Sequence, residues 1–299
     1  MSAPGAPLGP FQPRLVRQRK LRAAAGFADA AFLHRRAAVD LAERLEAIPR
    51  RFERVLVLGH PALFREALDE RPELNARLGE IVEADIANAA IEVNLEHLPF
   101  AEASFDLIVS PLLLHWANDL PGVFIQLRRA LKPDGLMLAN LFGGDTLTEL
   151  RFALLEAESE LTGGAAQRVS PFATLQDLAG LLQRAGFALP AADRDVVTVR
   201  YRAPMRLLAD LRAMGETAAF AERAPRNLSR RVLAEALRLY AERHADPDGR
   251  VRATFELLTA AGWAPHASQQ QPLKPGSAKT RMADALGTTE RRAGERAGE

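Results

Sequence analysis

The 299-residue sequence contains no cysteine. This absence excludes disulfide bridges, thiolate metal sites, cysteine-ligated iron–sulfur clusters and a cysteine nucleophile. Metal-ligand spacing is also lacking among the six histidines, which are His34, His60, His97, His115, His244 and His266. We therefore predict a protein without a bound metal.

Neither sign of charge is in excess, because 38 Asp and Glu balance 39 Lys and Arg. Such a balance gives no overall field for nucleic acid, and we predict no nucleic-acid partner. The sequence also lacks an apolar run approaching the ~18 residues of a transmembrane helix. Its first residues, MSAPGAPLGPF, lack the apolar centre of a signal peptide. These features predict a cytoplasmic protein whose membrane contact would be peripheral and made through a partner.

What the sequence does contain is an alternation of short apolar runs and helical patterns. Runs typical of buried strands lie at 55–59, 81–85, 90–95, 105–110 and 136–142, with a helix predicted at 120–131. Further strands are predicted at 196–201 and 251–263. Strands that alternate with helices predict an α/β fold with a parallel sheet and right-handed crossovers.

Two helical stretches, 205–216 and 228–244, separate the last two predicted strands. An insertion at this point would lie over the strand ends, where ligands bind in open α/β sheets. The sequence thus divides into a disordered start (1–12), a helical segment (13–50), an α/β core (51–202), an inserted helical cap (203–249), a final strand region (250–266) and a disordered tail (267–299).

The stretch from Phe105 to Arg151 contains a buried strand, a helix, a Lys-Pro-Asp-Gly turn and a second buried strand. It resembles the second half of the sheet of class I S-adenosylmethionine (SAM) methyltransferases. The resemblance implies a Rossmann-like, mostly parallel sheet of seven strands with helices on both faces, and SAM as the cofactor. In that fold a Gly-x-Gly-x-Gly loop after the first strand lets the backbone approach the methionine part of SAM.

The loop LGHPALF departs from that pattern. Gly59 keeps the first glycine position, whereas His60, Pro61 and Ala62 fill the others. Proline removes an N–H, and the added Cβ atoms occupy space meant for the ligand. Two interpretations stay open: a remodelled pocket that still binds SAM, or a strand-to-helix turn in which Pro61 starts the helix.

Three residues after the next strands are candidates for holding the cofactor. Asp85 ends the second predicted strand, where a carboxylate suits a ribose diol. It could instead cap a helix that begins near Ala87, but we favour the ribose. Asn94 could accept a hydrogen bond from the adenine amino group, with the Leu95 N–H reaching the ring. Alternatively, Asn94 is a polar loop residue.

Catalytic candidates follow the fourth and fifth strands. The segment from Ser110 to Trp116 leaves the carboxyl edge of the sheet, so Ser110 would face the cofactor. His115 could act as a base or orient a substrate, or it could simply pack beneath the following helix. Asp145 or Thr146 could face the substrate, but we expect one of them to cap the next helix.

Longer motifs resemble one family, the complex I assembly factors with a methyltransferase fold that are found in mitochondria and alphaproteobacteria. The most particular are FGGDTLTELR, the SPF segment, DLRAMGE and the GW…H-x-S-Q-Q ending, and the likeness spans roughly residues 15–278. It implies hydroxylation of an arginine on a complex I subunit. It also implies that Gly59, Asp85, Asn94 and the LLLHW segment lie on the cofactor side. A more distant resemblance is to the malonyl-carrier-protein methyltransferase of biotin synthesis.

Three functions are compatible with these features. The first is an enzyme that binds SAM and modifies a protein side chain, arginine above all, during complex I assembly. The second is a non-catalytic assembly chaperone with a degenerate SAM site, which the LGHPALF loop favours. The third is a small-molecule or carrier-protein methyltransferase, which leaves the GW…H-x-S-Q-Q ending without an explanation.

Overall fold

The computed structural model describes residues 9–222, 228–270, 281–285 and 287–288. The chain forms two units, residues 1–265 and residues 266–299. The first unit contains the sheet, and the described part of the second includes a short helix, α11 (Met282–Ala285). Residues 1–8 and most of 267–299, both expected to be disordered, lie outside the described residues.

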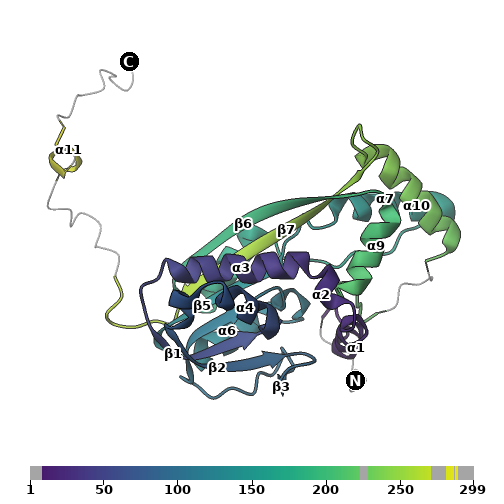
Figure 1. The fold of residues 1–299 in the computed structure, drawn as a ribbon. Helices are drawn as coiled ribbons and strands as arrows, with labels where there is room; N and C mark the ends of the chain where they lie inside the picture. Colours follow the sequence, from purple (N-terminus) through teal and green to yellow (C-terminus); the bar gives the residue numbers. More distant parts are fainter. Residues whose placement is uncertain (1–8, 223–227, 271–280, 286, 289–299) are drawn as a thin grey trace, which may run out of the picture. The chain divides into compact units, whose positions relative to one another are not determined.

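Seven strands form one sheet in the order β3-β2-β1-β4-β5-β7-β6 (Figure 1). The strands are β1 (Phe52–Leu58), β2 (Leu78–Asp85), β3 (Ile91–Glu92), β4 (Phe105–Ser110), β5 (Leu131–Phe142), β6 (Ala188–Tyr201) and β7 (Val251–Trp263). The first five pair in parallel, and β7 runs antiparallel to both of its neighbours. The predicted seven-stranded, mostly parallel sheet is confirmed.

Alternate residues of β1 face two separate cores, as expected for a strand buried on both sides. Val55 and Val57 pack in one core with α3 (Phe32–Glu46) and α4 (Pro61–Asp69), which α5 (Pro72–Asn75) follows. Leu56 and Leu58 pack in the other core with α6 (Leu120–Ala130) and α8 (Leu175–Arg184). Helices therefore cover both faces of the sheet.

The segment between β6 and β7 contains α9 (Pro204–Ala213) and α10 (Arg230–His244). α10 packs against α7 (Thr148–Thr162), and Figure 1 shows these helices near one end of the long β6–β7 pair. The buried Tyr240 on α10 donates a hydrogen bond from its hydroxyl to the Arg252 carbonyl, at 2.6 Å. These helices and α1 (Pro13–Ala23) surround the candidate site.

The start of the chain is more ordered than the predicted disordered segment 1–12 allows. Phe11 is buried, forms a β-bridge with Phe220, and packs edge-on against Trp116 with ring centroids 5.1 Å apart. Its N–H donates to Asn118 Oδ1 at 2.8 Å. The prediction was wrong for Phe11 because burial of one aromatic ring fixes the chain where the local composition favours disorder. Two further helices, α2 (Phe27–Ala30) and α3, follow α1.

No helix in the described ranges is long and apolar enough to cross a membrane.

Candidate active site

The loop after β1 turns sharply into α4. Gly59 has φ +96°, and a Cβ at this position would lie 2.7 Å from the Leu113 Cβ, so the turn requires glycine. His60 is also left-handed, with φ +47°, which is uncommon for a residue with a side chain. Pro61 occupies the first turn of α4. The loop is thus a strand-to-helix turn in which Pro61 starts the helix.

Asp85 lies at the carboxyl end of β2 and is bound by groups of the protein itself. Lys20 Nζ from α1 lies 2.5 and 2.7 Å from its two carboxylate oxygens. The His60 N–H donates to Oδ2 at 2.9 Å, and the Ile86 N–H donates to Oδ1 at 2.6 Å. The alternative that Asp85 caps a helix near Ala87 is wrong, because residues 86–90 form no helix.

His60 fills the space beside this ion pair. Its ring stacks on Phe27 with centroids 4.9 Å apart and lies 4.4 Å from the His34 ring. Lys20 Nζ is 3.4 Å from His60 Nε2, and since an ammonium can only donate, that nitrogen carries a lone pair. Burial, and then the positive charge of Lys20, hold the pKa of His60 well below its usual 6.5.

The residues around Asp85 and His60 do not fit the ribose and methionine parts of SAM. The cavity that Lys20, His60, Leu113 and Glu216 line has a volume of about 10 Å³, the space of a single water molecule. Ligand pockets are typically about 300–1,000 Å³. Lys20 instead holds the carboxylate that would bind the ribose diol.

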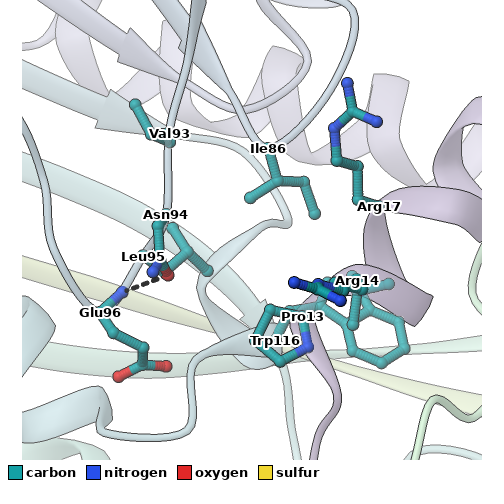
Figure 2. A pocket seen from close by; sticks show the side chains of 10 residues that line it. Pro13, Arg14, Arg17, Ile86, Val93, Asn94, Leu95, Glu96 and Trp116 are labelled. Carbon is teal, nitrogen blue, oxygen red and sulfur yellow. Dashed lines mark hydrogen bonds between the residues drawn. The ribbon is translucent and has the colours of Figure 1, made fainter. Parts of the chain in front are cut away.

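A separate cavity of about 220 Å³ lies beside Asn94 and Leu95, the residues predicted to contact adenine (Figure 2). Its lining also includes Ile86 and Trp116, together with Arg14 from α1. The Asn94 side-chain oxygen accepts a hydrogen bond from the Glu96 N–H at 3.1 Å, so it shapes its own loop. Asn94 and Leu95 therefore line a cavity with both apolar and charged walls, and their contact with adenine stays a prediction.

Ser110 lies elsewhere. It is fully buried at the end of β4, and its hydroxyl donates to the Leu58 carbonyl at 2.8 Å. The described cavities do not include Ser110 in their lining. Its hydroxyl therefore ties β4 to β1.

A buried carboxylate joins two histidines at the centre of the site. His34 Nε2 lies 3.1 Å from Glu216 Oε1, and His115 Nε2 lies 3.0 Å from Glu216 Oε2. An ionised carboxylate can only accept, so each ring donates from Nε2. Both Nδ1 atoms are buried without a hydrogen-bond partner. A second proton on either ring would therefore be buried without a hydrogen-bond acceptor.

The surroundings set the charge of this cluster. Burial alone would raise the pKa of Glu216, but the interactions with His115 and His34 outweigh it and lower the pKa to about 2. Burial lowers the pKa of His34 in spite of its hydrogen bond to Glu216. At neutral pH the Glu216 carboxylate is therefore ionised.

The two catalytic candidates from the sequence have different surroundings. His115 is buried, bound to Glu216, and packed against Phe142 with ring centroids 4.8 Å apart. Asp145 has a side chain that is 65% exposed, 3.9 Å from Arg194, and its N–H donates to Glu256. Only His115 joins the cluster.

The prediction that Asp145 or Thr146 caps α7 was wrong. The N-cap residue is Leu147, which is left-handed and makes no side-chain cap. The Thr146 hydroxyl instead hydrogen-bonds the backbone of Glu256, at 3.1 and 3.2 Å. Pairing with β7 thus takes the hydroxyl that would otherwise cap the helix.

A larger cavity, which we call the Glu216 groove, opens beside the cluster. It has a volume of about 770 Å³. Apolar side chains of α7 and α9 line it, with arginines and two glutamates, and they include Leu150, Leu154, Leu208, Leu211, Arg19, Arg168, Arg212, Glu216 and Glu222. Glu216 also lines the small cavity beside His60, so this residue borders both spaces.

Sequence reasoning missed Lys20, His34 and Glu216 as site residues. Lys20 belongs to the basic N-terminal stretch, and Glu216 ends the DLRAMGE motif, whose particular sequence was the one available signal. The described part of the chain contains no group of three His, Asp or Glu side chains arranged to hold a metal ion.

Comparison with known proteins identifies relatives over most of the chain. Residues 67–139 match a family described as "Methyltransferase domain". The chain is 42% identical to the "Arginine-hydroxylase NDUFAF5, mitochondrial" of Danio rerio over 201 residues, or 67% of this chain and 62% of that protein. It is 38% identical to the Homo sapiens protein of the same name over 252 residues, or 80% and 71% of the two chains. The chain thus spans less than two thirds of the zebrafish relative.

A second group of relatives is more distant. The chain is 32% identical to the malonyl-[acyl-carrier protein] O-methyltransferase of Halorhodospira halophila over 267 residues, or 84% of this chain and 87% of that protein. Among solved structures, the YcgJ protein of Bacillus subtilis superposes with a TM-score of 0.51 and 14% identity, covering 77% of this chain and 98% of that one. This structural likeness supports the fold alone.

Proposed function

Because the chain belongs to the family of the mitochondrial arginine-hydroxylase NDUFAF5, we propose that it modifies an arginine side chain of a partner protein. We propose as the partner a subunit of respiratory complex I, because the longer sequence motifs resemble complex I assembly factors. The protein would bind this subunit in the cytoplasm during assembly. The observation that carries this proposal is the Glu216 groove, which is large enough for a peptide side chain and is lined by the ionised Glu216. Hydroxylation would insert one oxygen atom of dioxygen into a C–H bond of the arginine. The other oxygen atom would leave as water, with two electrons and two protons supplied by an external reductant.

The proposed reaction does not use SAM. Lys20 binds Asp85, the carboxylate predicted to hold the ribose, and the cavity that Lys20 and His60 line is about 10 Å³. This argues equally against a carrier-protein methyltransferase, which needs SAM as its methyl donor.

We expect SAM at millimolar concentration to leave the thermal unfolding midpoint unchanged. A ligand that binds only the folded state would add about 2.7 kcal/mol of stability at a hundred times its dissociation constant. Differential scanning fluorimetry, with a SAM-binding methyltransferase as the positive control, measures this directly. A clear rise in the midpoint would mean that Lys20 and His60 move aside, and SAM would return as the cofactor.

A second candidate function is a non-catalytic assembly chaperone. The filled cofactor site favours it, because a protein that only holds its partner has no need for a cofactor. The two functions differ in what happens to the partner's arginine.

We expect one arginine of a complex I subunit to gain the mass of one oxygen atom only when the gene is present. Mass spectrometry of complex I from the wild type, a deletion strain, and the deletion strain complemented with Glu216→Gln would measure it. The variant should leave the arginine unmodified. If complex I falls in the deletion strain while the arginine is unmodified in every strain, the chaperone function is correct instead.

A further inference from the structure

The Glu216 carboxylate is a buried acid that no described lysine or arginine pairs with. Its side chain is only 8% exposed, and its hydrogen-bond partners are the imidazoles of His34 and His115. Buried charges in proteins are normally paired with an opposite charge, because removing an ion from water is costly. The two imidazole N–H groups hold the carboxylate in place.

The cations near the groove are engaged elsewhere or lie too far away. Lys20 is bound to Asp85, Arg168 pairs with Glu158, and Arg19 donates to the Thr217 carbonyl. Among the described residues, no lysine or arginine lies within ion-pair distance of Glu216. Within the described residues the cations near the groove are thus taken up by other groups, which leaves the Glu216 carboxylate open to a cationic ligand.

The groove gives such a ligand access to Glu216, which lines it. Leucines of α7 and α9, including Leu154 and Leu211, line the same groove and suit the aliphatic stem of a long side chain. A carboxylate offers about four lone-pair sites, and the two imidazoles use two of them. The remaining two can accept a bidentate pair of N–H donors, which a planar guanidinium provides and an ammonium does not.

We infer that Glu216 is the binding residue for the guanidinium of an arginine side chain that enters through the Glu216 groove. His34 and His115 are positioning residues that orient the two carboxylate oxygens. The inference rests on the proposed function for the identity of the ligand. The site itself follows from the buried Glu216 carboxylate and the groove that it lines.

Binding of a short labelled peptide tests this assignment. The probe is fluorescein-Leu-Ala-Arg-Ala-Leu-amide, and its match has citrulline, the neutral analogue of arginine, at the centre. By fluorescence anisotropy at neutral pH, the full-length protein should bind the arginine peptide on the order of thirtyfold more tightly, the effect of removing one partner of a buried charge pair. Glu216→Gln should abolish the preference. Glu222→Gln, which removes an exposed carboxylate from the same groove, should preserve it.

Equal binding of the two peptides by the wild type, or binding of neither, would overturn the inference. So would a preference that survives Glu216→Gln. If Glu216→Gln does not fold, the wild-type protein still tests the inference, because equal affinity for the arginine and citrulline peptides would contradict it. An arginine preference that depends on Glu216, combined with an unmodified arginine in complex I, would refute the proposed reaction and leave the binding site standing.

Discussion

Replacing Lys20 with methionine should lower the free energy of unfolding by about 3 kcal/mol, the typical cost of leaving one member of a buried ion pair alone. Methionine keeps most of the apolar stem but removes the ammonium that lies 2.5 and 2.7 Å from the Asp85 oxygens. The Asp85 side chain is 3% exposed, so water cannot replace the lost charge. Urea-induced unfolding at neutral pH would measure the change.

Asp85→Asn provides the matched control for this pair. It should cost less than Lys20→Met, because the Lys20 side chain is 15% exposed and can extend its ammonium toward water. The double variant should recover most of the stability that Lys20→Met loses, since it leaves no uncompensated carboxylate. If the effects of the two single variants simply add in the double variant, the ion pair does not hold α1 against the sheet.

This ion pair explains how the fold could keep an acidic residue at the end of β2 without a nucleotide. The carboxylate that suits a ribose diol is satisfied by Lys20, the His60 N–H and the Ile86 N–H. Helix α1 supplies the lysine, and His60 fills the space that glycines would leave open. The changed loop and the lysine thus act together, and neither alone would close the site.

The sheet could be predicted from the sequence because its signals are local. A strand buried on both faces reads as a continuous apolar run, and 105–110 coincides with β4. The inserted helices were equally visible, since 228–244 has a helical pattern and contains α10. Phe11 was missed because its order comes from distant contacts with Phe220 and Trp116.

The candidate site was only partly predictable, because its contacts join distant parts of the chain. His34 and Glu216 are 182 residues apart in sequence, and no spacing rule connects them. Asp85 was identified because strand ends meet at one edge of a parallel sheet. Its partner Lys20 is 65 residues away and belongs to a helix whose position the sequence does not indicate. Local sequence patterns therefore predict where the strands end, but they do not predict which distant side chains pack against those ends.

The protein should lose stability in two stages as the pH falls below neutral. Folding lowers the pKa of His34 and of His60 from 6.5, mainly because both rings are buried. Below pH 6.5 the unfolded chain therefore binds more protons than the folded chain, and the free energy of unfolding falls. Glu216 adds a second loss below pH 4.5, because its folded pKa is about 2. That difference corresponds to about 3 kcal/mol, present above pH 4.5 and lost as the pH falls to about 2.

The variant His60→Asn tests whether the first loss of stability comes from His60 or from a general effect of acid. Asparagine tolerates the left-handed backbone of residue 60 but does not titrate. Urea unfolding at a series of pH values from 8 to 4 should show a smaller loss between pH 7 and 5 for this variant than for the wild type. The absolute stability of the variant will be lower because its stacking on Phe27 is lost, so the slope with pH is the quantity to compare. His97→Asn, at an exposed histidine, should keep the wild-type slope.

Equal slopes for His60→Asn and the wild type would mean that His60 is not buried as a neutral ring, and the closed site beside Asp85 would have to open in solution.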